Sequence, residues 1–411
     1  MRAKLLTLVF ASVLSGRMAA ADWPQFHGPG GTGTSDAKLP ETWSDTDNIV
    51  WKTPLPGMGA SSPVVIGRRI FLTCSQGGAD DVERHVLCLD AEKGDIVWDK
   101  TVVSELPEQG KVREDHGYAS STPVANATHL FVFFGKSGVF CFDHAGKQIW
   151  NTKVGSQLNG WGSAASPVLY KNMVLVNASI ESQSLVALDQ KTGDEVWKAG
   201  GVNESWHAPV LAPRADGVTE VITAMIQEVK SFDADSGKLL WKCKSGIGWY
   251  MCPEPVFKDG ILYCIGGRSG TGGLAIRTGG SGDVTATHVL WSLPKGTNVP
   301  SPILHDGHVY YAHENLGVVN CINAKSGEVV YSERLDPNPG QIYASPVLAG
   351  GKLYYLGRGG QAVIVSAEPQ FKVLSKAKLE NGRGVFNASP AITGNRMLIR
   401  SNKFLYCIGS K

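Results

Sequence analysis

The fold is decided by residues 166–197, which read SPVLYKNMVLVNASIESQSLVALDQKTGDEVW. The stretch divides into four apolar runs of strand length, separated by turn-forming residues, a pattern typical of consecutive β-strands. Asp189 ends the third run and Gly193 follows in the turn, where glycine permits a positive φ and the aspartate can bond the turn's backbone. Trp197 marks the fourth run. The stretch therefore predicts a unit of four short strands.

The same unit recurs along the chain. A small residue, or its substitute, stands before a proline and an aliphatic residue at Pro63, Pro123, Pro167, Pro209, Pro255, Pro302, Pro346 and Pro390. From Pro123 onward the interval between these prolines stays between 42 and 47 residues, which is typical of propeller blades and not of helical repeats. We therefore expect an all-β fold, an eight-bladed β-propeller with four-stranded blades.

The last repeat supplies three strands and lacks a fourth. The segment 48–52, which contains Trp51, resembles a fourth strand and has no repeat before it. We expect this N-terminal strand to complete the last blade and close the ring, which removes open sheet edges. The expected organisation is a signal peptide at 1–21, an N-terminal segment packing on the propeller at 22–46, and the propeller at 47–411.

The first residues have the pattern of an export signal. Arg2 and Lys4 precede an apolar run at 5–14, and small residues lead up to Ala21. The run is shorter than the roughly 20 residues that span a bilayer. No cysteine follows it, so we expect cleavage near Ala21 and a periplasmic or secreted protein that is not a lipoprotein.

The charge balance argues against a nucleic-acid partner. The chain carries 39 basic and 37 acidic side chains, and three of the basic ones lie before Asp22. The exported chain would therefore be close to neutral, and it contains no basic run of the kind that binds phosphate backbones. We expect no transmembrane segment, and we expect a monomer.

Seven of the eight cysteines fall into two groups. Four occupy the same place in four repeats, which predicts small core residues: Cys88, Cys141, Cys321 and Cys407. Cys243, Cys252 and Cys264 lie closer together in sequence and could include one disulfide.

Three repeats depart from the pattern, and the first does so through an insertion at 77–84 and a longer exit at 104–116. The fifth has Arg277 in place of the turn aspartate and a lengthened turn that contains Asp283. Such a glycine-rich turn can bind a metal or an anion, or Asp283 can cap its own backbone, and the second interpretation is favoured. The seventh repeat lacks both the aspartate–glycine turn and the aromatic residue of the fourth strand.

If the strand after each proline is innermost, the segments before it and the hairpins between second and third strands meet at one mouth of the channel. Aromatic rings and polar groups gather there, which suits a planar or extended ligand. The candidate ligand-binding residues are Tyr118, Trp161, Trp206, His207, Trp249, Tyr250, Tyr343, Asn387, Arg268 and Arg358. The alternative is that they fill a narrow channel.

The repeat pattern, with Ser-Pro-Val, Leu-x-Ala-Leu-Asp-x-x-Thr-Gly and tryptophan, resembles the pyrroloquinoline-quinone (PQQ)-type propeller repeat from Trp51 to the end of the chain. This family includes quinoprotein alcohol dehydrogenases and the BamB propeller of the outer-membrane assembly machinery. The segments 23–29 and 282–288 are similar to those of secreted PQQ-like repeat proteins. The resemblance implies the propeller and export, and fold alone does not choose an activity.

A quinoprotein would require calcium held by oxygen ligands beside the cofactor, a tryptophan floor and a catalytic aspartate. Under this resemblance the candidate oxygen ligands are Glu181, Glu228, Glu314 and Asn315. Asp115 is the nearest candidate base, and the adjacent cysteine pair of many such dehydrogenases is absent. We therefore assign no catalytic residue and favour an exported binding or scaffold module. A PQQ- and calcium-dependent dehydrogenase and a glycan- or peptide-recognition protein are the alternatives.

Overall fold

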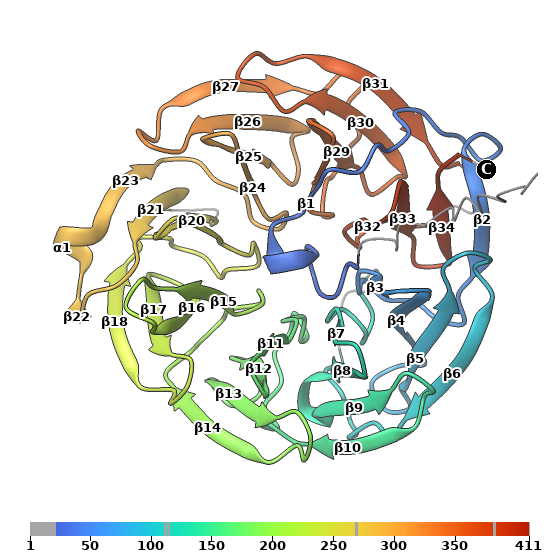
Figure 1. Ribbon diagram of the computed structural model, residues 1–411, viewed down its shortest axis with the longest axis horizontal. Helices are drawn as coiled ribbons and strands as arrows, with labels where there is room; N and C mark the ends of the chain where they lie inside the picture. Colours follow the sequence, from blue (N-terminus) through green and yellow to red (C-terminus); the bar gives the residue numbers. More distant parts are fainter. Residues whose placement is uncertain (1–21, 111, 113–115, 268–269, 381–383, 411) are drawn as a thin grey trace, which may run out of the picture.

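The computed structural model describes residues 22–110, 112, 116–267, 270–380 and 384–410. In this part of the chain, eight sheets, each built on a blade of four antiparallel strands, surround a central axis, as Figure 1 shows. The predicted eight-bladed, all-β propeller is confirmed. The strand after each repeat proline is the one nearest the axis. The proposed signal peptide at 1–21 lies outside the described residues.

The first four blades follow one another in chain order. Their strands, from the axis outward, are β3 (Val64–Ile66), β4 (Arg69–Gln76), β5 (Glu83–Asp90) and β6 (Ile96–Val102); β7 (Val124–Ala125), β8 (His129–Phe133), β9 (Val139–Asp143) and β10 (Gln148–Thr152); β11 (Val168–Tyr170), β12 (Met173–Ala178), β13 (Ser184–Asp189) and β14 (Glu195–Gly200); and β15 (Val210–Pro213), β16 (Thr219–Ala224), β17 (Glu228–Asp233) and β18 (Leu239–Lys244).

The other four blades continue around the ring. Their strands are β19 (Val256–Lys258), β20 (Ile261–Ile265), β21 (Gly273–Arg277) and β23 (Val289–Leu293); β24 (Ile303–His305), β25 (His308–Ala312), β26 (Val318–Asn323) and β27 (Val329–Arg334); β28 (Val347–Ala349), β29 (Lys352–Leu356), β30 (Gln361–Ser366) and β31 (Val373–Lys378); and β32 (Ala391–Thr393), β33 (Arg396–Arg400), β34 (Phe404–Ile408) and β2 (Ile49–Pro54).

Five short elements stand outside this pattern. They are the 3₁₀ turns η1 (Pro29–Gly31) and η2 (Gly135–Ser137), the short strands β1 (Thr34–Ser35) and β22 (Gly282–Asp283), and the single helical turn α1 (Thr285–His288). Among the described residues, no helix combines the length and the apolar character needed to cross a membrane.

Strand β2 closes the ring. It pairs antiparallel with β34, so that Trp51 lies opposite Cys407 in the eighth blade. The predicted closure by an N-terminal strand is therefore confirmed. It joins the two ends of the described chain in one sheet, which leaves no gap in the ring (Figure 1).

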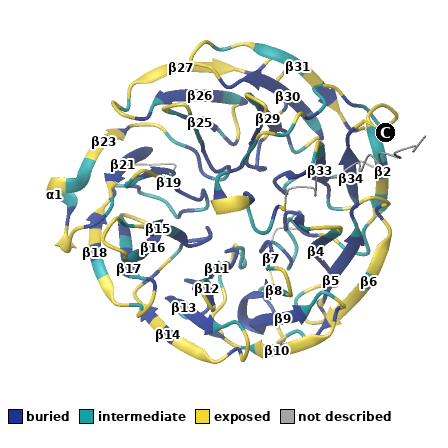
Figure 2. Ribbon diagram, in the orientation of Figure 1, coloured by how far each residue is buried: buried dark blue, intermediate teal, exposed yellow. Residues whose placement is uncertain are grey.

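The second and third strands of the blades form the core, and the outermost strands alternate between buried and exposed residues, as in β14 (Figure 2). In each blade the outermost strand carries a β-bulge just before the position that an aromatic residue occupies in most blades. In most blades this residue lies opposite a small residue of the neighbouring strand, as Trp98 lies opposite Cys88. The bulge turns the aromatic side chain inward. The four repeat cysteines are buried at such positions, as predicted.

All eight cysteines are free, so the disulfide considered among Cys243, Cys252 and Cys264 is not formed. Cys243 and Cys264 pack in the same core cluster, where each serves as a small buried apolar side chain. Cys243 lies on β18 of the fourth blade and Cys264 on β20 of the fifth, whereas Cys252 lies in the connection between these blades.

The lengthened turn of the fifth blade adds a strand to the fourth. Its β22 pairs parallel with β18, Trp241 opposite Gly282. Asp283 accepts hydrogen bonds from the backbone N–H and the hydroxyl of Thr285 at 3.0 and 2.6 Å, so the self-capping interpretation is confirmed. Val284 is buried beside β18. This extra strand was not predicted.

The N-terminal segment reaches the axis and the seventh blade. Trp23 exchanges two backbone hydrogen bonds with Val65 of β3, and β1 pairs parallel with β28. Between them η1 lies at the centre of the ring, with Pro29 exposed (Figure 2). Farther along, Trp43 packs on Tyr354 with ring centroids 6.4 Å apart. Contacts along its whole length thus hold residues 22–46 against the propeller.

Candidate functional site

A cavity of about 180 Å³ lies within the ring. Most of its lining comes from the segments that precede the innermost strands, which are brought together because all eight innermost strands face the axis (Figure 1). Six of the predicted ligand-binding residues line it: Trp161, Trp206, His207, Tyr250, Tyr343 and Asn387. We call this cavity the funnel.

One wall of the funnel is aromatic. Tyr250 is its centre, with ring centroids 5.7 Å from Trp161, 5.1 Å from Trp206 and 5.3 Å from Trp249. Trp206 is fixed, because its indole N–H donates to the carbonyl of Gly162 at 2.9 Å. Trp161 is 47% exposed. An immobile aromatic base with one accessible indole at its edge offers a stacking surface to a ligand.

The opposite wall combines a ring with polar groups. Tyr343 stacks on His116, ring centroids 6.1 Å apart, and the Arg358 guanidinium lies 4.4 Å from the Tyr343 ring centroid. Arg358 donates to Asn387 Oδ1 at 2.8 Å and to Gln341 Oε1 at 2.6 Å. Arg358 thus stands behind the lining and orients it. Trp249 likewise backs the lining, and Arg268 lies outside the described residues.

His207 has a structural role in this wall. The Ala224 N–H donates to its Nε2 at 3.0 Å, and its Nδ1 is 2.6 Å from the carbonyl of Ala208, so Nδ1 carries the proton. Burial lowers the pKa of this imidazole. With both nitrogens hydrogen-bonded to the backbone, His207 stays neutral. It cannot exchange a proton with a ligand without losing one of these hydrogen bonds.

A belt of hydroxyl groups forms the base of the funnel. Each belt residue stands directly before a repeat proline, and its hydroxyl accepts the backbone N–H of the residue before the proline in a neighbouring blade. These bonds join Ser62 to Thr122, Thr122 to Ser166, Glu254 to Ser301, Ser301 to Ser345, Ser345 to Ser389 and Ser389 to Ser62, at 2.9–3.1 Å, with the N–H donor named first in each pair.

The belt has an interruption in the fourth and fifth blades. Ala208 and Glu254 occupy the positions that carry hydroxyls elsewhere. Glu254 is buried, its Oε2 has no hydrogen-bond partner, and burial raises the pKa of its carboxyl well above the usual range. A Cβ on Gly31 of η1 would lie 2.6 Å from Glu254 Oε1. The carboxyl is therefore packed against the N-terminal segment.

The belt and Glu254 were missed as site residues from sequence. The signal was present, because every belt residue precedes a repeat proline and Glu254 is the one acidic residue in that position of a repeat. Phe26 and Cys252, which also line the funnel, were missed as well. They follow no repeat pattern.

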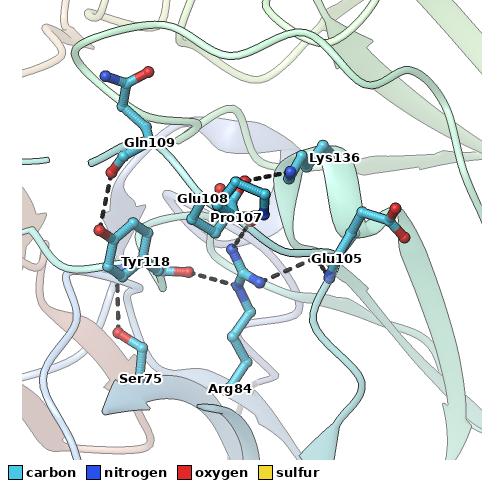
Figure 3. Close-up of polar contacts among 9 residues, drawn as sticks. Ser75, Arg84, Glu105, Pro107, Glu108, Gln109, Tyr118 and Lys136 are labelled. Atoms are coloured by element: carbon cyan, nitrogen blue, oxygen red, sulfur yellow. Dashed lines mark hydrogen bonds and ion pairs between the residues drawn. The ribbon is translucent and has the colours of Figure 1, made fainter. Parts of the chain in front are cut away.

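A second, smaller pocket lies beside the funnel, and Ser120 lines both. Figure 3 shows part of its wall, where Arg84 pairs with Glu108 and donates to the carbonyl of Tyr118 at 3.1 Å. The Tyr118 hydroxyl donates to the carbonyl of Gln109 at 2.9 Å. The structure thus places Tyr118 in this side pocket and not in the funnel.

Glu181 faces the same side pocket. Only 2% of this residue is exposed, its Oε2 has no partner, and burial raises the pKa of the carboxyl to about 7. The pocket is about 30 Å³, enough for water molecules.

The structure does not bring the other predicted oxygen ligands to Glu181. Glu228 pairs with Lys230 at 3.2 Å. Glu314 accepts the Asn298 N–H at 3.1 Å, and the Asn315 side-chain oxygen accepts from Gln341 at 2.8 Å. Within the described ranges, no three His, Cys, Asp or Glu side chains are grouped as a metal site.

The propeller is similar to known proteins of more than one function. BamB from Moraxella catarrhalis has a TM-score of 0.63 at 16% identity over 88% of this chain and 97% of that one. A europium-containing methanol dehydrogenase has a TM-score of 0.67 at 14% identity over 92% and 89%. A quinohemoprotein alcohol dehydrogenase from Comamonas testosteroni has a TM-score of 0.63 at 12% identity over 97% and 82%. At these identities the likeness shows the fold.

No curated protein sequence matches the chain significantly. A family model described as outer membrane protein assembly factor BamB matches residues 82–333 and 226–403, which together span most of the propeller. The chain therefore belongs to this BamB-like family of PQQ-type repeat propellers.

Proposed function

We propose that the protein is an exported, monomeric binding module that holds a protein or another extended ligand at the mouth of the funnel. The observation that carries this proposal is the aromatic wall around Tyr250, which is preformed and ends in the accessible indole of Trp161. A rigid aromatic surface in a concave site favours binding, since little side-chain entropy is lost when a ligand arrives. The family description, an assembly factor, also supports a binding role.

The rival function is catalysis by a calcium-bound quinone, which the similarity to two dehydrogenase structures suggests. Such a cofactor would need carboxylate ligands for the metal and cationic partners for its own carboxylates. Among the described residues that line the funnel, none is acidic, and none is lysine or arginine. Glu228 and Glu314 are already engaged elsewhere. This donor set does not fit the cofactor, and we derive no reaction through it.

Site-specific photocrosslinking tests the proposal. A benzoylphenylalanine in place of Trp161 should crosslink a ligand from the exported fraction of the source cell. The same probe in place of Val97, an exposed residue on the outermost strand β6, serves as the matched control. Crosslinks from residue 97 with none from residue 161 would place the binding surface on the blade edges and contradict the proposal.

A further inference from the structure

The hydroxyl belt leaves its own protons available to the funnel. The belt hydroxyls of Ser62, Thr122, Ser166, Ser301, Ser345 and Ser389 each accept a backbone N–H. None of the six donates to another atom of the described residues, and all six line the funnel. A hydroxyl has one proton to donate and two lone pairs. The belt therefore presents a ring of hydrogen-bond donors, each with an oxygen that can also accept, around the base of the cavity.

The funnel's charge and polarity restrict what can occupy it. A wholly apolar ligand would leave the belt donors without partners once water is expelled, at a cost for each donor. An ionised ligand would be buried without a counter-charge, because the described lining contains no acidic, lysine or arginine side chain. The ligand that fits is uncharged and bears several oxygen atoms that both donate and accept hydrogen bonds.

The size and the aromatic wall specify its shape. A cavity of about 150 Å³ takes one benzene molecule, and the funnel has about 180 Å³. It therefore holds a single substituted six-membered ring. Tyr250, with Trp206 packed edge to face against it at an interplanar angle of 63°, offers such a ring an apolar surface. The side chains of Asn298 and Asn387 add amide groups to the lining. Trp161, at the exposed edge, can contact a second unit outside the cavity.

We infer that the funnel binds one uncharged pyranose ring of a neutral glycan, with its apolar face on the aromatic wall and its hydroxyl groups on the belt. This inference rests on the proposed binding function and names the ligand class for that site. The rest of the glycan chain then extends out of the funnel through its mouth, past Trp161. Belt hydroxyls that can each donate and accept match sugar hydroxyls because each sugar hydroxyl also does both.

Calorimetric titration of the exported protein tests the inference. The probes are glucose, galactose, mannose and N-acetylglucosamine and their neutral β- and α-linked oligosaccharides, beside glucuronate and glucosamine as charged counterparts. We expect at least one neutral sugar to bind and an oligosaccharide to bind more tightly than its monosaccharide. Trp161→Ala should abolish the gain from chain length, about tenfold or more for one lost stacking contact, and Trp161→Phe should retain most of it.

A substitution in the belt distinguishes the contribution of the hydroxyl belt to binding from that of the aromatic wall. Ser345→Ala removes one donor and should weaken binding of the monosaccharide itself, whereas Ser345→Thr keeps the hydroxyl and should restore it. Ser332→Ala, on the exposed outer strand β27, is the control. If no neutral sugar binds, or if binding is indifferent to both Trp161→Ala and Ser345→Ala, the inference is wrong. If the probe at residue 161 still crosslinks a ligand in that case, the proposed binding function is retained and only the proposed ligand class is wrong.

Discussion

The indole of Trp51 packs against Gly94, across the seam between the last blade and the first. A Cβ on Gly94 would come within 2.5 Å of this ring, and the Trp51 Nε1–H donates to the carbonyl of Ala91 at 3.2 Å. The same contact recurs between neighbouring blades, as with Trp150 and Gly193. The turn glycine is therefore required both for its positive φ and for its missing side chain.

Replacing Gly94 separates these two requirements. Gly94→Ala should lower the free energy of unfolding by the cost of a left-handed alanine, about 1–2 kcal/mol, and by a further 1–3 kcal/mol or so for overpacking against Trp51. Gly260→Ala is the matched control, since its φ of +76° resembles the +79° of Gly94 and no atom lies within 4 Å of the new Cβ. Equal losses in denaturant titrations of the two variants would contradict the seam contact.

Trp43 substitutes for the aromatic residue that the seventh blade lacks. Ser375 occupies that position in the ladder, opposite Ile364, and its hydroxyl donates to the carbonyl of Glu41 at 2.6 Å. Trp43 itself is 4% exposed. Trp43→Ala should therefore destabilise the protein by about 3–5 kcal/mol, as a large core truncation does. Thermal unfolding would measure this, and Trp161→Ala, which truncates an exposed indole, should leave the midpoint nearly unchanged.

The belt contributes to stability as well as to the funnel. In Ser345→Ala, the buried N–H of Ser301 loses its acceptor, which should cost about 1–3 kcal/mol. Ser345→Thr should cost less, because Thr122 already serves as a belt residue. Chemical denaturation compares the two variants. An alanine variant as stable as the wild type would show that the belt does not link the blades.

Stability should depend on pH through Glu181. Its pKa of about 7 in the fold exceeds the 4.5 of an unperturbed glutamate, so between these values the folded protein holds a proton that the unfolded chain has released. The contribution of this group is then fully present below pH 4.5 and falls by about 3 kcal/mol as the pH rises to neutrality.

Glu181→Gln removes this dependence. Relative to the wild type, the variant should gain stability as the pH rises from 4.5 to 7, which unfolding curves across that range would measure. Glu228→Gln removes a charge elsewhere and should keep the wild-type decline. A constant difference between wild type and Glu181→Gln at all pH values would refute the role given to Glu181.

Sequence patterns predicted the parts of the structure that repeat. The blade count, the closure by Trp51 and the buried cysteines all follow from one strand pattern, because each blade satisfies the same packing. Features that occur once were missed. The pairing of β22 with β18 joins segments far apart in sequence, and the convergence of Trp161 on Tyr250 depends on how blades are placed around the axis. Tyr118 was assigned to the funnel by position alone, and a local turn toward Gln109 directs it to the side pocket.

The central claim is that the funnel is a binding site without quinone chemistry. Titration of the purified exported protein with PQQ in the presence of calcium, followed by dye reduction with simple alcohols and aldoses, tests it most directly. Because the described lining contains no acidic, lysine or arginine side chain, we expect no tight one-to-one binding and no substrate-dependent dye reduction. Stoichiometric PQQ binding that supports dye reduction and is lost in Trp161→Ala would contradict the account and make the protein a quinoprotein dehydrogenase.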